Sequence, residues 1–571
     1  MKEPIKYIAI GIAALGIIGC IGLLFPQMRQ VIIGFGEQII GRSLNTDLWD
    51  RRLLMGAFVY FYIVTVFLIV FFSKFEIPQI PPEKQEMVLS KVEISLICLY
   101  SCMLLFLSSV NNAIWLDEAY SLSFIQHSWD ELIRLLIIDV HPPFYYFVLK
   151  AASLVFGNSI FAMKMVSVFP TILMVVFVSL FLKKEFSHKA VLVFLLSCIA
   201  SQSITSYAIE IRMYSWALFF ITLMSVSAWY FFKSGKKRWW TALLFCALGA
   251  AYSHYWAAVA ATIGYLLLFI YALKCKKDKI IALLLLAVFG IVFYLPWLPI
   301  FIEQFSQVSN NFWIKPLTIG TILGYIYTVF STGDYFGDRF LCFMFAFVFI
   351  SFFIRKNKTE RDLFFFGGVC CSVLLVLSGI VISIAIRPLF YARYLIPIVG
   401  LIWMFFAVEC SVINKKLTAF ICVILVSIGV MSFSLSAQKE IRGSKEFNAF
   451  YTCFTERMQD DDAFIFISPT ETGWLHIVGI TKYLFPNNIY TIIYSGSNIQ
   501  LDELTYKLWG AAYTDYEDNI FNHRTVWVFV IEEAGIVNTQ TEINGEFSGS
   551  FGWDGYRFRL YRRNLSNMEP L

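Results

Sequence analysis

The sequence predicts a polytopic α-helical membrane protein that ends in a smaller α/β domain. Hydrophobic residues make up 58% of its 571 residues and charged residues only 15%, whereas average soluble domains contain about 45–50% and about 25%. The excess lies in long uncharged runs, many of which are long enough to cross a hydrocarbon core of ~30 Å. Short connections rich in Lys and Arg separate several of these runs, as is typical of alternating membrane loops.

We expect about thirteen membrane-spanning helices from the length of these runs. They lie at residues 7–25, 54–73, 94–110, 161–182, 190–207, 213–232, 239–252, 255–273, 280–300, 338–354, 363–386, 391–410 and 417–435. The first run follows Lys2 and Lys6, as the apolar part of a signal peptide would. It lacks a small-residue cleavage site, which favours a retained anchor.

The distribution of Lys and Arg predicts the orientation of the chain. Basic clusters occupy the short connections at 183–189, 233–238, 274–279, 355–358 and 415–416. Because cytoplasmic loops are enriched in Lys and Arg, we expect these connections and the N-terminus in the cytoplasm. Both ends of the stretch from Trp239 to Tyr271 are basic, which favours two helices split at Ser253-His254. With an odd number of spans, the C-terminal region then lies outside the cell.

Three regions of the expected outer face are too long to be simple turns. They are residues 111–160, residues 301–337 and the C-terminal region. We therefore divide the chain into N-terminal extra transmembrane helices at 1–93, a transmembrane core at 94–436 and an extracytoplasmic domain at 437–571. The segment 26–53 carries arginines against the expected orientation, and we expect an amphipathic interfacial segment there.

Two helices are expected within the first outer region. The apolar spacing of Ser128–Ile138 indicates one helix. His141–Gly157 is apolar but short for a full span. A crossing at that point would also move every later basic loop to the outside, so we expect a helix that lies at the outer interface.

The C-terminal domain is expected to be a sheet covered by helices. Asp462–Pro469, Asn487–Ser495 and Thr525–Glu533 are β-branched and aromatic runs typical of strands, and helical patterns at 444–458, 471–485 and 499–509 alternate with them. The domain holds 11 Lys and Arg against 18 Asp and Glu. It contains no glycine-rich phosphate loop and no nucleophile elbow. We therefore expect a supporting or acceptor-docking role, and the acidic tail argues against a nucleic-acid partner.

The 12 cysteines do not indicate a zinc site. Most lie within apolar runs, and no Cys-x-x-Cys or Cys/His ligand spacing occurs. Cysteine in such positions usually acts as a small buried hydrophobic residue.

Ionisable residues at the expected membrane edge are informative because a charge within the bilayer costs on the order of 2.5–3.5 kcal/mol. Seven such residues lie at the outer ends of expected spans: Asp117, Glu118, Glu210, Arg212, His254, Arg387 and Arg393. A single acidic residue there is often a solvated helix start, a single Arg often snorkels to the surface, and a single His is often a turn residue. Together they predict a site for an anionic lipid headgroup, because a carboxylate serves as a general base and arginines bind phosphate.

The order of several short motifs resembles a known family. The motifs are Trp115-Leu116-Asp117-Glu118-Ala119-Tyr120-Ser121, His141-Pro142-Pro143-Phe144-Tyr145-Tyr146, Arg212-Met213-Tyr214, Ser253-His254-Tyr255 and Ala392-Arg393-Tyr394-Leu395. They resemble the membrane-embedded glycosyltransferases of the GT-C fold. The resemblance is to the bacterial branch similar to protein O-mannosyltransferases and aminoarabinose lipid A transferases, glycosyltransferase family 39. It covers about residues 94–410.

The resemblance implies a sugar donor linked to polyprenyl phosphate and transfer, with inversion, to an acceptor hydroxyl on the outer face of the membrane. Asp117 would then be the general base, and Arg393 and Arg212 would stabilise the phosphate leaving group. Glu118 and His141 would orient donor or acceptor, with His141 fixed beside Asp117 by the helix that Pro142-Pro143 begin. Further substrate-binding residues would be Glu210, Tyr214, His254 and Tyr394. The acceptor would be a cell-envelope glycan, a lipid or a protein.

The resemblance leaves the metal open. Some relatives carry a second Asp shortly after the Arg-Met-Tyr stretch that helps to bind a metal, whereas Ser215-Trp216-Ala217-Leu218 follow here. Glu210 is the only nearby acid that could substitute. We therefore expect no metal ligand set, with a divalent cation as the alternative.

Two other functions fit the same helices. A transporter or flippase of a lipid-linked saccharide is disfavoured because no internal repeat is visible and the ionisable residues cluster at one face rather than near the midplane. A glycan polymerase or ligase would use the same class of donor, and it typically needs no His-Pro-Pro helix.

Overall fold

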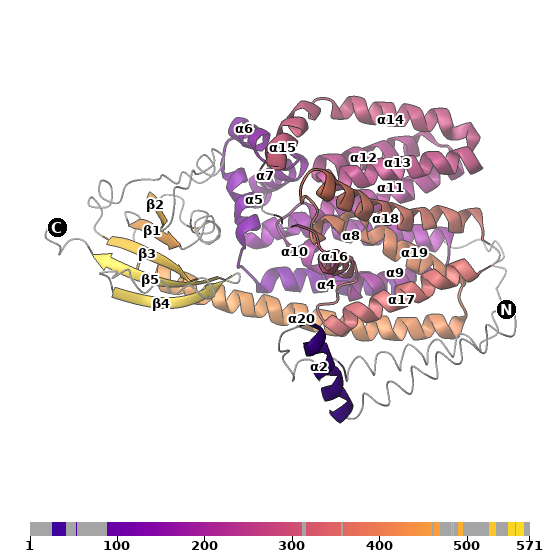
Figure 1. Ribbon diagram of the computed structural model, residues 1–571. Coiled ribbons are helices and arrows are strands. Elements are labelled where there is room, and N and C mark those ends of the chain that lie inside the picture. Colours follow the sequence, from indigo (N-terminus) through magenta and orange to yellow (C-terminus); the bar gives the residue numbers. More distant parts are fainter. Residues whose placement is uncertain are drawn as a thin grey trace.

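The structure is a computed structural model, and it describes most of the expected transmembrane core and parts of the C-terminal domain. The described residues are 26–40, 53, 88–310, 314, 316–355, 358–458, 462–468, 481, 484, 489–494, 525–532, 546–553 and 556–564. A bundle of helices carries a small β-sheet at one end, and one long helix joins the two (Figure 1). The expected spans at 7–25 and 54–73 lie outside the described residues. The segment 26–53 begins with a helix, α2 (Pro26–Ile40).

The described part of the chain contains eight helices that are long and apolar enough to cross a membrane, and up to ten if each of two bent pairs counts as one span. The eight are α4 (Lys91–Val110), α8 (Ile160–Glu185), α11 (Tyr214–Ser234), α13 (Tyr255–Cys275), α17 (Tyr335–Ile354), α18 (Glu360–Ala385), α19 (Val399–Val412) with its preceding 3₁₀ helix η2 (Ala392–Ile398), and α20 (Lys415–Thr455). The chain is thus a multi-pass membrane protein. The predicted count of about thirteen spans stays a prediction.

Each bent pair includes a run that was expected as a single span, at 190–207 or at 280–300. Helix α14 (Ile280–Tyr294) is followed by α15 (Leu298–Asn310) at a bend of 69°. Pro296 lies in the break, and proline ends a helix because it has no N–H to donate and its ring clashes with the preceding turn. Helix α9 (His188–Ala200) meets α10 (Gln202–Ile209) at 63°. There the Gln202 N–H donates to the carbonyl of Ser331 (2.7 Å) instead of continuing the helix.

The first outer region forms three short helices. They are α5 (Leu116–Gln126), α6 (Trp129–Ile138) and α7 (Phe144–Phe156). The predicted helix at Ser128–Ile138 is confirmed, and its N-terminus is capped by the Ser128 hydroxyl, which accepts from the Glu131 N–H (3.3 Å). Helix α7 starts directly after Pro143 and ends at Gly157, whose φ of 77° needs a residue without a side chain. Its position at the membrane interface stays a prediction.

The predicted division of the stretch from Trp239 to Tyr271 is also confirmed. Helix α12 (Lys237–Ser253) ends directly before His254, and α13 starts directly after it. The second outer region contains most of α15 and the short helix α16 (Ile319–Val329).

Helices α11 and α19 form the centre of the bundle, where small residues allow close packing. A Cβ at Gly249 of α12 would lie 2.5 Å from the ring of Phe220, and one at Gly400 would lie 2.0 Å from the Thr222 hydroxyl. Glycine at these positions lets the helix backbones approach each other, as is typical between membrane helices. The close contacts hold the start of α11 beside η2, and both carry predicted site residues.

The sheet at the end of the bundle has five strands in the order β2-β1-β3-β5-β4. The strands are β1 (Ala463–Ser468), β2 (Ile489–Tyr494), β3 (Thr525–Glu532), β4 (Glu546–Trp553) and β5 (Tyr556–Asn564). Strand β1 pairs in parallel with β2 and β3, whereas β5 pairs antiparallel with β3 and β4. The first three strands were predicted, and the β4–β5 hairpin was not.

Helix α20 connects the sheet to the bundle as one continuous element of 41 residues. It includes residues 444–455 of the expected helix at 444–458 and runs through residue 436, where the boundary of the C-terminal domain was placed. The ring of Phe450 near its end packs against Phe529 of β3 and Phe551 of β4. The expected helices at 471–485, apart from residues 481 and 484, and at 499–509 lie outside the described residues.

Candidate active site

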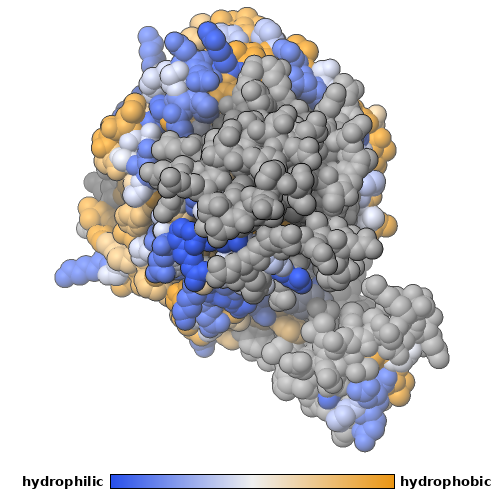
Figure 2. All heavy atoms as spheres, turned by 90° about the vertical axis from the view of Figure 1, so that its left-hand side faces the viewer, coloured by the Kyte–Doolittle hydropathy of each residue, from blue (hydrophilic) through white to orange (hydrophobic). Residues whose placement is uncertain are grey.

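The predicted site residues gather at the end of the bundle that carries the sheet (Figure 1). They come from the start of α5, the turn before α7, the connection between α10 and α11, the connection between α12 and α13, and η2. Figure 2 faces this end and shows hydrophilic side chains gathered on it, while the visible flanks of the bundle are largely apolar.

The centre of the cluster is a carboxylate between two arginines. Arg393 Nη1 donates to Asp117 Oδ2 at 2.6 Å, and Arg212 Nη2 lies 3.9 Å from the same oxygen. The Asp117 side chain remains 21% exposed, whereas Arg212 is only 1% exposed. One buried and one partly exposed guanidinium therefore face a carboxylate that a ligand can still reach.

The electrostatic surroundings keep Asp117 ionised. Burial alone would raise the pKa of Asp117. The positive charges of Arg212 and Arg393 outweigh burial and hold this pKa below its ordinary value. The cluster thus presents a stable negative charge next to two cations.

Arg212 is held in place by a short chain of hydrogen bonds. Its Nη1 donates to the Asp117 carbonyl (3.3 Å) and to the Ser121 hydroxyl (3.1 Å). Its Nη2 lies 3.0 Å from His141 Nε2. Because a guanidinium only donates hydrogen bonds, His141 Nε2 is the acceptor in this contact.

The other nitrogen of His141 then carries the proton. His141 Nδ1 donates to Asp139 Oδ2 at 3.0 Å, and the second oxygen of Asp139 accepts from the Tyr120 hydroxyl at 2.8 Å. Asp139 is fully buried. It thereby selects the neutral His141 tautomer that accepts from Arg212 and fixes the plane of the guanidinium.

Glu118 faces away from the arginines and binds backbone. One carboxylate oxygen accepts from the Ile211 N–H (3.0 Å) and the other from the Trp115 N–H (3.2 Å). Burial raises the pKa of Glu118, although Lys164 and the two backbone donors act in the opposite direction. Glu118 therefore ties the start of α5 to the turn that carries Arg212, and the two neighbouring acids have different surroundings.

Aromatic rings surround Arg393. Its guanidinium lies 5.5 Å from the ring centre of Tyr391, 5.9 Å from that of Trp115 and 6.0 Å from that of Tyr214. Such contacts attract a cation through the negative face of the ring. They steady the arginine without occupying the hydrogen-bonding positions that an anion would need.

His254 is packed between two tyrosine rings behind this arrangement. Its ring lies 5.3 Å from that of Tyr214 and 5.1 Å from that of Tyr394. Its Nδ1 accepts from the Trp256 N–H (3.1 Å) and so caps α13. Burial, together with the positive charges of Arg212 and Arg393, holds the pKa of His254 well below its ordinary value, so this histidine is neutral.

Glu210 borders the cluster at the end of α10. Burial raises the pKa of Glu210 to about 8, with further contributions from the negative charges of Glu118 and Asp117. Its Oε2 is buried and has no hydrogen-bond partner among the described residues. Arg387, also expected at this face, lies in the connection between α18 and η2.

The residues of the cluster do not fit a metal site. Within the described part of the chain, no group of three His, Cys, Asp or Glu side chains is arranged to hold a metal ion. The carboxylate of Asp117 is paired with arginine and that of Glu118 with backbone N–H groups. Glu210 was considered as a replacement for the second Asp of some relatives. It does not complete a metal-ligand set with the described residues around it.

Sequence reasoning missed Asp139 and the two side chains that share its network, Tyr120 and Ser121. A signal for Asp139 was present, since it stands two residues before His141 in Asp139-Val140-His141-Pro142-Pro143. An acid so close to a histidine is a common device for fixing its tautomer. Its burial could not be foreseen from the sequence.

Comparison with known proteins agrees with the arrangement of the helices. The chain matches no family model and no curated protein. It does match crystal structures of ArnT from Cupriavidus metallidurans. The apo state aligns with a TM-score of 0.58 and 9% identity over 84% of this chain and 99% of ArnT. The protein has a GT-C-like fold.

The second ArnT structure is bound to undecaprenyl phosphate. It aligns with a TM-score of 0.57 and 10% identity over 85% of this chain and 100% of ArnT. At this level of identity the likeness concerns the fold. It extends over the whole length of ArnT.

Proposed function

We propose that the protein transfers a sugar from a polyprenyl-phosphate donor to an acceptor hydroxyl at the outer face of the membrane, with inversion at the anomeric carbon. The observation that carries this proposal is the partly exposed Asp117 carboxylate between Arg393 and Arg212. This arrangement offers a proton acceptor and two phosphate-binding cations within one cluster.

The two arginines provide the site for the leaving group. When the bond between the anomeric carbon and the phosphate oxygen breaks, negative charge develops on the polyprenyl phosphate. Preorganised cations stabilise such charge most effectively where water is excluded. Arg212 is rigidly held and buried, and Arg393 is the more exposed of the two. The undecaprenyl phosphate bound by ArnT supports a donor lipid of this class.

Asp117 acts as the general base in this proposal. It takes the proton of the acceptor hydroxyl while the hydroxyl oxygen forms a bond to the anomeric carbon, and the phosphate leaves from the opposite side. The electrons of the broken bond remain on the phosphate oxygen. A positioned general base typically contributes a factor of ~10²–10⁴ to the rate.

Donor binding would also make Asp117 a better base. In the free protein Arg393 lies 2.6 Å from Asp117 and lowers the pKa of that carboxyl. A donor phosphate competes for the same guanidinium. As Arg393 turns to the phosphate, Asp117 loses part of the interaction that stabilised its ionised form, and its proton affinity rises.

The other site residues position these groups. Glu118 holds the turn that carries Arg212, and His141 holds the guanidinium of Arg212. Tyr214, His254 and Tyr394 form a neutral aromatic wall behind Arg393. The sheet domain lies beside the cluster and would support the acceptor, which is a cell-envelope glycan, lipid or protein.

The test compares Asp117→Asn with a matched control. Asp130→Asn changes another acid of the same outer region, an exposed residue in the first turn of α6. Cells that lack the gene are complemented with wild type or with either variant, and the envelope glycans are compared by mass spectrometry. The sugar that depends on the gene is expected to disappear with Asp117→Asn and to persist with Asp130→Asn.

A second measurement separates chemistry from donor binding. Purified Asp117→Asn is expected to retain binding of undecaprenyl phosphate, because Arg393 and Arg212 remain, whereas Arg393→Gln is expected to weaken it. Sugar transfer that survives Asp117→Asn would rule out the general-base assignment. Undecaprenyl phosphate binding that is unaffected by Arg393→Gln would rule out the phosphate site.

A further inference from the structure

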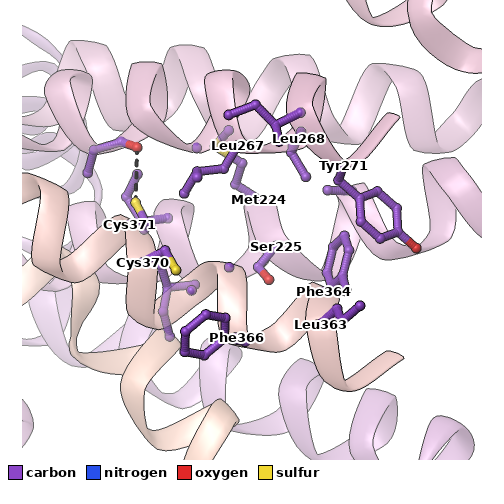
Figure 3. A pocket seen from close by; sticks show the side chains of 18 of the residues that line it. Met224, Ser225, Leu267, Leu268, Tyr271, Leu363, Phe364, Phe366, Cys370 and Cys371 are labelled. Carbon is purple, nitrogen blue, oxygen red and sulfur yellow. Dashed lines mark hydrogen bonds between the residues drawn. The ribbon is translucent and has the colours of Figure 1, made fainter. Parts of the chain in front are cut away.

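An apolar cavity lies in the half of the bundle opposite the Asp117 cluster. It occupies about 330 Å³ between α11, α13, α18 and the start of α19, within the ~300–1,000 Å³ range of small-molecule sites. On α13 its lining includes Ala260 and Lys274, which are about 21 Å apart along the helix at 1.5 Å per residue. Figure 3 shows side chains of α11, α13 and α18 arranged around the open space.

The walls of the cavity are suited to a hydrocarbon chain. Almost all of the lining is apolar, with the rings of Phe364 and Phe366 on one side and Leu267 and Leu268 on the other (Figure 3). Gly367 contributes room, because a Cβ at this position would meet nothing within 4 Å. A length of about 21 Å exceeds one leaflet of a ~30 Å hydrocarbon core, so an acyl chain fits lengthwise.

The cavity is open at the side of the bundle. Ile270 and Leu363 line it and are each 48% exposed. Exposed apolar side chains at this depth face the hydrocarbon of the membrane. A lipid chain can therefore enter laterally from the bilayer, without passing the Asp117 cluster at the other end of α13.

A positively charged side chain lies at the end of the cavity far from the Asp117 cluster. Lys274 lines it and has no ion-pair or hydrogen-bond partner among the described residues. Glu360, an acid in this region, is neutralised by Lys276 at 2.9 Å and also accepts from the Tyr271 hydroxyl at 2.6 Å. Lys277 and the Lys279–Asp278 pair lie in the next turn. The charge at the mouth is thus positive.

We propose that this cavity binds one acyl chain of an anionic glycerophospholipid whose headgroup pairs with Lys274. A basic pocket between membrane helices, at the surface where basic loops gather, is the usual form of an anionic-lipid site. An apolar cavity without a lipid chain would leave its lining without contacts on one side, which is unfavourable. The lipid would tie α13 to α18 at the end of the bundle far from the reaction.

The test measures lipid binding directly, independently of any transferase activity. The full-length protein is delipidated in detergent and titrated with phosphatidylglycerol or phosphatidylcholine, and bound lipid is counted by native mass spectrometry. Wild type is expected to bind phosphatidylglycerol more tightly than phosphatidylcholine. Lys274→Gln is expected to weaken phosphatidylglycerol binding about fivefold, the effect of one surface lysine near an anionic lipid.

Two further variants test the cavity. Gly367→Leu fills the space and is expected to lower phosphatidylglycerol binding to the level of phosphatidylcholine. Its control is Gly290→Leu, in α14 and outside the cavity, where a Cβ would make only an ordinary contact of 3.7 Å with Leu244. Should Gly367→Leu elute as aggregate, Gly264→Leu fills the cavity from α13, since its Cβ would press only on the flexible end of Met224 (3.2 Å).

Three results would overturn the proposal. Equal binding of the two phospholipids by wild type would exclude the headgroup contact. Unchanged phosphatidylglycerol binding in the cavity-filling variants would exclude the cavity as the site. Displacement of phosphatidylglycerol by equimolar undecaprenyl phosphate, lost on cavity filling, would show that the cavity belongs to the donor lipid instead. The Lys277→Gln variant, in the same basic segment but outside the cavity, is expected to behave as wild type.

Discussion

At the scale of single residues, the geometry around Arg212 depends on an acid that does not touch it. Asp139 accepts from His141 Nδ1 and from Tyr120, and only then is His141 Nε2 free to accept from Arg212. Each link has a single hydrogen-bonding sense, because the guanidinium donates and the carboxylate accepts. Asp139 is therefore a positioning residue whose effect on catalysis would pass through His141.

Asp139→Asn is expected to lower kcat without a matching change in the KM for the donor. The amide replaces one acceptor oxygen with a donor, so the new side chain cannot accept from both Tyr120 and His141 through separate oxygens. Misplacement of a catalytic group by ~1 Å costs on the order of 10²-fold. Steady-state kinetics on the purified enzyme in liposomes would measure the two constants.

Tyr120→Phe is the matched control for this variant. It removes one of the two hydrogen bonds to Asp139 and leaves the bond to His141. Its kcat is expected to stay close to that of wild type. A loss in Tyr120→Phe as large as in Asp139→Asn would contradict the positioning role and indicate a general loss of packing.

Glu210 predicts a pH dependence of donor binding. Burial and the charges of Glu118 and Asp117 raise the pKa of Glu210 to about 8, so the carboxyl is mostly neutral below this pH and becomes negative above it. A second negative charge beside Asp117 opposes an anionic donor. The KM for the donor is expected to rise above about pH 8, at most about tenfold per pH unit.

Glu210→Gln keeps the shape of the side chain and cannot ionise. The KM profile of this variant is expected to be flat from about pH 7 to about pH 9. An unchanged rise in the variant would assign the titration to another group.

The sequence was informative about which residues lie at this end of the bundle. It was less informative about where their side chains point. Asp117, Arg212 and Arg393 all stand at the ends of apolar runs, so their depth follows from the length of each run, and the structure brings them together. The different surroundings of Asp117 and Glu118 depend on how α5 is rotated, which periodicity does not determine for so short a helix. The role of Asp139 depends on the turn before α7, whose conformation is not encoded in any hydrophobic periodicity of the sequence.

At the scale of helices and strands, the packing of α11 against α19 decides how precisely the site is held. Gly400 lies where a Cβ would come within 2.0 Å of the Thr222 hydroxyl and 3.0 Å of its other side-chain carbons. Both helices begin beside the site, one at Tyr214 and the other after η2 with Arg393. A change in their spacing would therefore move the guanidinium groups.

Gly400→Ala is expected to destabilise the protein by about 1–3 kcal/mol, the usual cost of overpacking a well-packed core. The measurement is the midpoint of thermal unfolding in detergent micelles. The double variant Gly400→Ala/Thr222→Ala is expected to recover most of the loss. Thr222→Ala alone should cost little, because its hydroxyl is buried without a hydrogen-bond partner among the described residues. Additive losses in the double variant would show that the two side chains do not meet.

The elements that the sequence did not predict have recognisable physical causes. Pro296 divides the apolar run at 280–300, but an average of hydropathy over this run includes the break and therefore predicts one span. Strand β4 contains Gly549 and Gly552, and β5 carries Arg557, Arg559, Arg562 and Arg563. Glycine and charge are unusual in strands. The β4–β5 hairpin is held in the sheet because β5 pairs along the edge of β3. This pairing depends on tertiary structure.

At the scale of the whole molecule, one helix carries the C-terminal sheet to the end of the bundle where the Asp117 cluster lies. Helix α20 contacts the first outer region through Glu440, whose carboxylate accepts from Asn111 Nδ2 at 2.6 Å. The Asn111 carbonyl in turn accepts from buried Lys164 (2.8 Å). The sheet and the cluster therefore face the same side of the membrane, whichever side that is.

The side itself is predicted by the basic connections, and two thiols at opposite ends of the bundle can test it. Ser128→Cys places a thiol at the exposed start of α6, in the first outer region. Cys275 is naturally exposed at the end of α13, 20 residues after Tyr255 and so about 30 Å away along the helix. With the remaining cysteines replaced by serine, an impermeant maleimide is expected to label residue 128 in intact cells and Cys275 only after lysis. The reverse pattern would place the cluster in the cytoplasm, and sugar transfer on the outer face would then be excluded, because the carboxylate and both arginines would face the wrong compartment.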